Sequence, residues 1–265
     1  MWRRMKTGLI VGFVLLGWAG TSSAQAKTVV GDLLPENGVE LEISATSDFY
    51  SQYIWRGMRL DNDYVYQPGV SISGYGFDVS VWGSFDTDQN DGLSSDEIDT
   101  TVSYTYALEG LSLGGQDLAA ISLSVGHVYY AFPSPSTFSK EFFLGVAYDG
   151  FLAPSLTYYY DYSRASQGGG DGTYLVLDLG HSIPLAEEYG VTLDLGGHVG
   201  YNQRLFIRGE GGDLGLSMGV TVPLTTGLSV SPTMNYSLPF GGVEDEDDGN
   251  YEDEYFWGVG VSCSF

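Results

Sequence analysis

The stretch that decides the fold is Tyr255-Phe256-Trp257-Gly258-Val259-Gly260-Val261-Ser262-Cys263-Ser264-Phe265, at the carboxyl end of a 265-residue chain. Every second position from Tyr255 to Phe265 is apolar, and the residues between are mostly small or polar. Such alternation is typical of a β-strand whose two faces meet different surroundings. We expect this strand to close a barrel against the first strand, with its apolar face toward lipid.

The same alternation recurs along the chain and predicts about twelve strands. They are expected near 39–56, 62–74, 76–86, 97–108, 118–132, 139–149, 151–163, 172–184, 189–202, 213–223, 227–238 and 254–265. Each is long enough to cross a bilayer as a tilted strand of about 9–11 residues. The connections alternate between tight turns and longer loops rich in Asp, Gly and Ser. The pattern predicts an all-β transmembrane antiparallel barrel over residues 39–265, with short periplasmic turns and long extracellular loops.

The composition separates this reading from a soluble β-domain. The polar faces carry Ser, Thr, Gly, Asn and Asp with almost no Lys, which suits a crowded aqueous interior better than a solvent-exposed sheet face. A formal charge of −24 repels nucleic acid and anionic surfaces. The single cysteine, Cys263, cannot form an internal disulfide. Nothing in the sequence calls for a cofactor.

The first 26 residues read as a secretory signal peptide. Arg3, Arg4 and Lys6 precede an apolar run from Leu9 to Ala19, and small residues lead to Ala26. The alternative, a membrane anchor, needs a longer apolar span. Residues 27–38 would then be a periplasmic segment before the barrel, and the mature protein would lie in the outer membrane of a Gram-negative bacterium.

Several short motifs in the first half of the mature chain resemble one family in their order. They are Ser47-Asp48-Phe49-Tyr50 with Tyr53-Ile54-Trp55-Arg56-Gly57, Val81-Trp82-Gly83-Ser84, Glu97-Ile98-Asp99, Tyr129-Tyr130-Ala131-Phe132-Pro133, and Glu141-Phe142 with Tyr148. These motifs are similar to those of the TorF-type porins, a family of bacterial outer-membrane barrels. The resemblance implies a porin-like protein for passive diffusion of small solutes, and names no solute.

The chain end also resembles the insertion signal of outer-membrane proteins, which the barrel assembly machinery reads. Its residues here are Trp257, Val259, Val261 and Phe265. Cys263 departs from that signal, which more often has an aromatic residue at this place.

If the apolar faces meet lipid, the polar faces predict a pore lining. The candidates are Asp48, Arg56, Asp78, Glu97, Asp99, Glu141, Asp161, Asp178, Asp194 and His198. A wall rich in carboxylates favours cations over anions. The alternative is a plugged barrel in which these acids are hydrogen-bonded internally, with Arg56 pairing Asp48 or Glu97.

Basic and aromatic residues gather near the expected strand ends. Arg59, Lys140, Arg164, Arg204 and Arg208 fall on the outer side and are expected to face lipopolysaccharide, although ordinary loop solubility explains them equally well. The aromatic residues predicted for the membrane girdles are Tyr53, Trp55, Tyr158, Tyr160, Tyr162, Tyr255 and Trp257.

Three further readings stay open. Residues 86–97 resemble an EF-hand loop but place Gly92 one position late, and 244–248 form a second acidic cluster, so weak Ca²⁺ binding is an alternative to solvated loops. A non-conducting structural or adhesive barrel is the alternative function. An outer-membrane hydrolase is less favoured, because no motif ties His127, His181 or His198 to a serine. The oligomeric state is not indicated.

Overall fold

The computed structural model describes residues 41–87, 97–113, 115–133, 137–245 and 252–265. The expected signal peptide and residues 27–38 lie outside these ranges. The elements are β1 (Glu42–Tyr50), β2 (Tyr53–Trp55), β3 (Met58–Asp61), β4 (Val65–Gly74), β5 (Phe77–Asp86), β6 (Glu97–Ala107), β7 (Ser112–Leu113), β8 (Gln116–Asp117), β9 (Ile121–Phe132), β10 (Thr137–Tyr148), β11 (Ser155–Asp161), η2 (Ala165–Gln167), β12 (Thr173–Ala186), η3 (Glu187–Tyr189), β13 (Val191–Gln203), β14 (Glu210–Thr225), β15 (Leu228–Gly241) and β16 (Glu254–Ser264).

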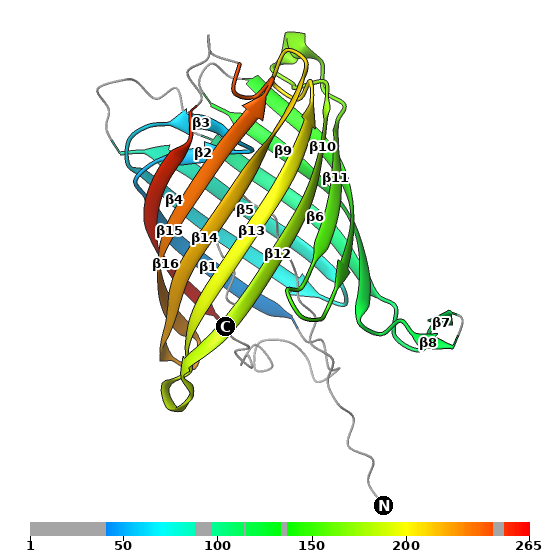
Figure 1. Ribbon diagram of the computed structural model, residues 1–265, viewed down its shortest axis with the longest axis vertical. Coiled ribbons are helices and arrows are strands. Elements are labelled where there is room, and N and C mark those ends of the chain that lie inside the picture. The colour runs from blue at the N-terminus through cyan, green and yellow to red at the C-terminus, as the bar shows by residue number, and fades with distance from the viewer. Residues whose placement is uncertain (1–40, 88–96, 114, 134–136, 246–251) are drawn as a thin grey trace, which may run out of the picture.

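Twelve of these strands form one closed antiparallel barrel, which confirms the predicted fold class (Figure 1). Their order around the ring is β1-β16-β15-β14-β13-β12-β11-β10-β9-β6-β5-β4. The last strand closes on the first, with Ala45 opposite Cys263 and Phe49 opposite Val259. The Phe265 N–H donates to the Ile43 carbonyl at 2.9 Å. The closure expected from the alternating chain end is therefore present.

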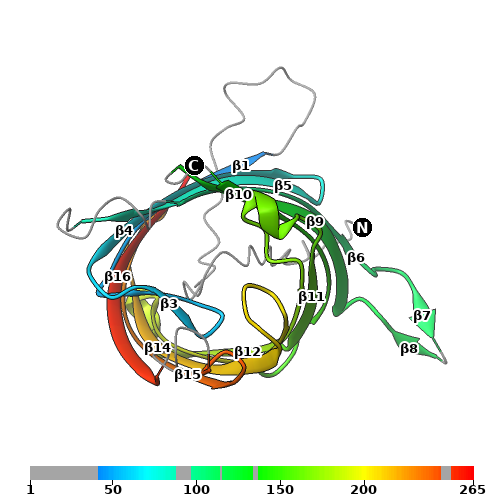
Figure 2. The same cartoon turned by 90° about the horizontal axis from the view of Figure 1, so that it is seen from above.

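The connections differ between the two ends of the barrel, which we call the short-turn end and the loop end. At the short-turn end, Tyr75 and Gly76 join β4 to β5 with φ of 54° and 84°, the conformation of a tight two-residue hairpin. The first residues of β1 and the last residues of β16 also lie at the short-turn end. The small β7–β8 hairpin extends sideways from it (Figures 1 and 2). Among the described residues, no helix is long and apolar enough to cross a membrane.

The two faces of the barrel wall are reversed relative to a water-soluble protein. Leu216 and Met218 are each 48% exposed on the outside, whereas Asp99 and Glu141 are 3% and 0% exposed on the inside. The outward residues of β16, Trp257, Val259 and Val261, belong to the same exposed apolar surface. An apolar exterior around a polar interior is what a bilayer-spanning barrel requires.

The first strand is shorter than predicted. The alternation suggested one strand over 39–56 followed by a short link, but β1 ends at Tyr50 and residues 53–61 form a separate hairpin of β2 and β3. This hairpin lies within the ring at the loop end (Figure 2). Tyr53 is only 5% exposed, so it and its neighbour Trp55 pack inside the barrel rather than in the aromatic girdle. Of the other predicted girdle residues, Tyr255 is 75% exposed and faces outward.

Candidate functional site

A two-residue turn forms the tip of the β2–β3 hairpin. Trp55 pairs with Met58, and between them Arg56 and Gly57 have φ of 50° and 80°. Both central residues of a type I′ turn need positive φ, which glycine adopts freely and arginine only with strain of about 1–2 kcal/mol. The strained turn places the Arg56 side chain at the point where the hairpin meets the opposite wall.

The hairpin crosses the lumen. It leaves the barrel wall between β1 and β4 and enters the lumen. In the ring of twelve strands, β11 and β12 lie directly opposite that position. Arg56 contacts residues of those two opposite strands, Tyr159 on β11 and Tyr174 on β12. The hairpin therefore spans the inner diameter of the barrel at its loop end.

Arg56 is held by a carboxylate and three aromatic rings. Its Nη1 and Nη2 each donate to Glu141 at 2.8 Å, a two-point ion pair in which the Arg56 side chain is 8% exposed and that of Glu141 is 0% exposed. The guanidinium carbon lies 4.3 Å from the Trp55 ring centre and 4.5 Å from those of Tyr159 and Tyr174. Burial alone would lower the pKa of Arg56, but the Glu141 carboxylate raises it, so the group stays charged. The expected pairing of Arg56 with Asp48 or Glu97 was wrong.

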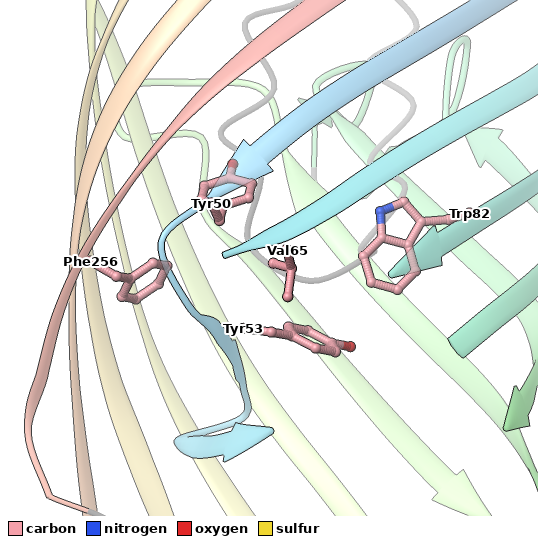
Figure 3. Packing of buried hydrophobic residues seen from close by; sticks show 5 residues of the cluster. All are labelled: Tyr50, Tyr53, Val65, Trp82 and Phe256. Carbon is pink, nitrogen blue, oxygen red and sulfur yellow. The ribbon is translucent and has the colours of Figure 1, made fainter. Parts of the chain in front are cut away.

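One flank of the hairpin is fixed to β5 and β6. The Tyr53 hydroxyl donates to Glu97 at 2.9 Å, and its ring lies 5.8 Å from that of Trp82. Burial and the Glu97 carboxylate raise the pKa of the Tyr53 hydroxyl well above its usual value, which keeps it a hydrogen-bond donor. Figure 3 shows the cluster that these rings form with Tyr50, Val65 and Phe256.

The other flank packs on β14 and the β15–β16 connection. A side-chain carbon added to Gly57 would lie 2.7 Å from the Asp213 Cβ and 3.2 Å from Val243, so only glycine fits. Met58 is buried with Ile207 and Val243. The described beginning of the β15–β16 connection therefore folds inward at Val243 and packs on the hairpin.

Asp213 is itself fixed by its neighbours. Its carboxylate accepts from the Tyr174 hydroxyl at 2.9 Å and lies 2.5 Å from His198 Nε2. Trp55 packs against the cluster of Figure 3 and against the Met58 cluster, so it is the common contact of both flanks. It also packs against a third buried cluster of the described residues, formed by Tyr159, Tyr174, Val176 and Leu205.

The other acids predicted to line a pore lie on the inner face but differ in their surroundings. Asp161 is fully buried and accepts from Ser139 and from the N–H groups of Ser163 and Gly170, so it fixes the loop after β11. Asp194 accepts from hydroxyls of Ser182, Thr192 and Thr221.

Fewer contacts surround the remaining predicted acids. Asp48 is buried on β1 beside Gly260. One buried carboxylate oxygen in each of Asp78, Asp99 and Asp178 has no hydrogen-bond partner among the described residues. On the inner wall that is described, acidic side chains therefore outnumber basic ones.

The predicted lipopolysaccharide-facing residues are not equivalent. Arg59 lies on β3 and forms an ion pair with Glu254, which ties the hairpin to β16. Lys140 has its Nζ 4.7 Å from the centre of the Phe138 ring on the outer side of β10. Arg164, Arg204 and Arg208 are exposed in connections at the loop end.

The lumen toward the short-turn end is lined differently. Serine and threonine hydroxyls face one another there, as in Ser44 with Ser71 at 2.7 Å and Ser229 with Ser262 at 2.6 Å. A cavity of about 40 Å³ lies next to Tyr159, and its polar lining is Thr101, Ser103, Ser124, Ser155 and Thr157. Small hydroxyl side chains leave more space than the aromatic residues of the loop end.

Sequence reasoning missed part of the site. Tyr159 lies inward between the outward Tyr158 and Tyr160, and its place in the alternation was the available signal. Asp213 likewise belongs to the polar face of its strand, which is the same signal that indicated the other acids. The Arg56-Gly57 pair between short apolar segments was the signal for a hairpin.

The acidic loops are only partly described. Residues 88–96 and 246–251 lie outside the described ranges, so the structure leaves the Ca²⁺ expectation untested. Within the part of the chain that is described, no group of three or more His, Cys, Asp or Glu side chains could hold a metal ion.

Comparison with known proteins gives a family and a fold. A family model described as "Bacterial protein of unknown function (Gcw_chp)" matches residues 36–236. The solved structure of the KdgM porin is similar with a TM-score of 0.52 at 12% identity, covering 84% of this chain and 99% of that one. The NanC porin gives 0.51 at 11% identity, covering 83% and 98%. No curated protein matches the sequence. At these identities the likeness shows the fold alone.

Proposed function

The chain belongs to the Gcw_chp family of bacterial proteins of unknown function, and from that premise we propose that it is an outer-membrane, porin-like channel for small solutes with a preference for cations. The observation that carries the proposal is the inside-out wall, apolar outside and acidic inside, on a barrel similar to those of two porins. The TorF-type resemblance of the first strands supports the same reading.

The charge of the inner wall supports cation preference. Arg56 forms an ion pair with Glu141, and His198 lies beside Asp213 and opposite Asp178, whereas Asp48 and Asp78 form no ion pair with a basic side chain among the described residues. Unpaired carboxylates at a narrow aqueous passage raise the local concentration of cations.

Planar-bilayer recording across a salt gradient tests this function. Purified wild-type protein should give ion-conducting channels whose reversal potential has the sign for cations. An anion-selective reversal potential contradicts the cation preference. No conductance from protein that is folded by its heat-dependent gel mobility contradicts the channel and favours the structural or adhesive alternative.

Location and surface contacts are further parts of the proposal. Separation of inner and outer membranes on a density gradient should place the protein in the outer membrane, and recovery in the periplasm contradicts it. We assign lipopolysaccharide contact first to Lys140, since it lies on the outer surface, and then to Arg164, Arg204 and Arg208. Arg59 has Glu254 as its partner and is the weakest candidate.

The hydrolase alternative gains little from the geometry. His127 Nε2 lies 2.7 Å from the Tyr162 hydroxyl, and His198 contacts Asp213. These contacts join histidine to a phenol or a carboxylate, whereas serine hydrolysis needs histidine beside the nucleophile.

A further inference from the structure

The contacts of Arg56 are those of a bound guanidinium ligand. Two N–H groups meet the two oxygens of one carboxylate at 2.8 Å, and the flat group lies within 4.5 Å of three ring centres. Planar two-point pairing combined with ring stacking suits guanidinium and does not suit a compact ammonium group. A side chain that only anchors a loop needs fewer contacts than these.

Most of this site belongs to the barrel wall. Glu141 and Tyr130 lie on β10 and β9, and Tyr159 and Tyr174 lie on β11 and β12, whereas only Trp55 comes from the hairpin. The wall groups are also bonded to one another or to the wall. The Tyr130 hydroxyl donates to Glu141 at 3.0 Å, and the Tyr174 hydroxyl donates to Asp213 at 2.9 Å. A site whose groups are fixed in this way is preorganised for its ligand and does not depend on Arg56 for its shape.

The hairpin accepts backbone strain to reach the site. Arg56 has a φ of 50°, which a side-chain-bearing residue rarely adopts unless its surroundings compensate. The interactions of the side chain with the wall supply that compensation. The arrangement is therefore a ligand group carried on a tether, rather than a turn with an incidental ion pair.

We propose that Glu141, Tyr130, Tyr159 and Tyr174 form a guanidinium-binding site in the lumen, which the chain's own Arg56 occupies as a tethered ligand. Soluble compounds with a monosubstituted guanidinium group compete for this site, and the hairpin leaves the lumen when they win. The inference deepens the proposed function by naming a class of recognised cation, and it rests on that function only for its effect on conductance.

Binding is tested first in detergent, without reference to conduction. Arg56→Ala empties the site, and methylguanidinium is titrated into the folded variant by calorimetry, with methylammonium and urea as charge and shape controls. We expect methylguanidinium to bind at least about ten-fold more tightly than methylammonium. We expect Glu141→Gln added to Arg56→Ala to abolish the difference. Equal binding of the two cations, or binding unaffected by the second substitution, overturns the site.

A second variant guards against misfolding. Arg56→Lys keeps the charge at the hairpin tip but loses the two-point pairing, so methylguanidinium should still bind with a weaker apparent affinity than in Arg56→Ala, because the tether competes. If Arg56→Ala does not fold, absence of methylguanidinium binding by folded Arg56→Lys overturns the site.

Bilayer recording then separates the two proposals. Arg56→Ala should spend more time in its highest conductance level than wild type, and methylguanidinium should reduce that fraction. Selective binding of methylguanidinium without any conductance supports the guanidinium site and contradicts the channel function. Conductance without selective binding of methylguanidinium supports the channel function and contradicts the guanidinium site.

Discussion

The lumen near the loop end is packed with aromatic rings and ion pairs, whereas the lumen near the short-turn end is lined with small hydroxyl residues. Tyr53, Arg56 and Glu141 illustrate the first, and the Ser229–Ser262 pair illustrates the second. Both regions are polar inside and apolar outside, but the inner wall at the loop end carries large side chains such as Tyr130, Glu141 and Tyr159. The β2–β3 hairpin packs on these side chains and acts as a plug at that end only, so the difference depends on the wall and the hairpin together.

The largest effect is expected from Gly57→Val. A Cβ there meets Asp213 at 2.7 Å, and the φ of 80° is unfavourable for valine. A penalty of about 1–3 kcal/mol on the docked hairpin changes its docked-to-undocked ratio about 5- to 150-fold. Single-channel recording should show that the variant spends a larger fraction of time in its highest conductance level than wild type.

Gly110→Val is the control for that change. Gly110 has a φ of 74° but nothing within 4 Å, so valine there carries a similar backbone strain without touching the hairpin. Equal conductance changes in both variants would mean that docking of the hairpin does not limit ion flow.

Tyr53→Phe tests how much the contacts at the loop end contribute to the stability of the barrel. The change removes the Tyr53 hydrogen bond to the buried Glu97 carboxylate, and it should lower the free energy of unfolding by about 1–3 kcal/mol. The measurement is thermal unfolding in detergent, followed by gel mobility. Tyr66→Phe on the outer surface, where the hydroxyl accepts a 3.3 Å bond from Ser47, should change it by less than about 0.5 kcal/mol. Similar losses in both would contradict the special role of the Tyr53–Glu97 bond.

The paired change Asp78→Asn with Asp178→Asn tests whether acids outside the plug set selectivity. Removing two inner-wall charges should lower the cation-to-anion permeability ratio about two-fold, read from the reversal potential. Asp149→Asn, in an exposed short turn, provides the control. An unchanged ratio in the paired variant would assign selectivity to the plug instead.

The smallest effect is expected from Ser229→Ala. Its hydroxyl pairs with that of Ser262, and loss of one neutral hydrogen bond in a hydrated lumen should cost less than about 1 kcal/mol in thermal unfolding. Ser139→Ala near the loop end removes a donor from the fully buried Asp161 and should cost more. The reverse order would contradict the proposed difference between the two regions.

The barrel could be predicted closely because its signals are local. Alternation located all twelve barrel strands, and β16 closes on β1 as the pattern of Trp257 to Phe265 suggested. The same rule failed at 51–56, where alternation continued although the chain left the wall. Period two describes any extended segment with two faces, so it does not distinguish a wall strand from a hairpin inside the lumen.

The sequence by itself determined which face of each strand is apolar, the number of strands and the excess of acid over base. Only the tertiary structure decided that Arg56 pairs with Glu141, a residue 85 positions away, across the diameter of the barrel. The physical reason is that a strand's faces are set by its own side chains, whereas a cross-lumen contact depends on which strands lie opposite each other after closure.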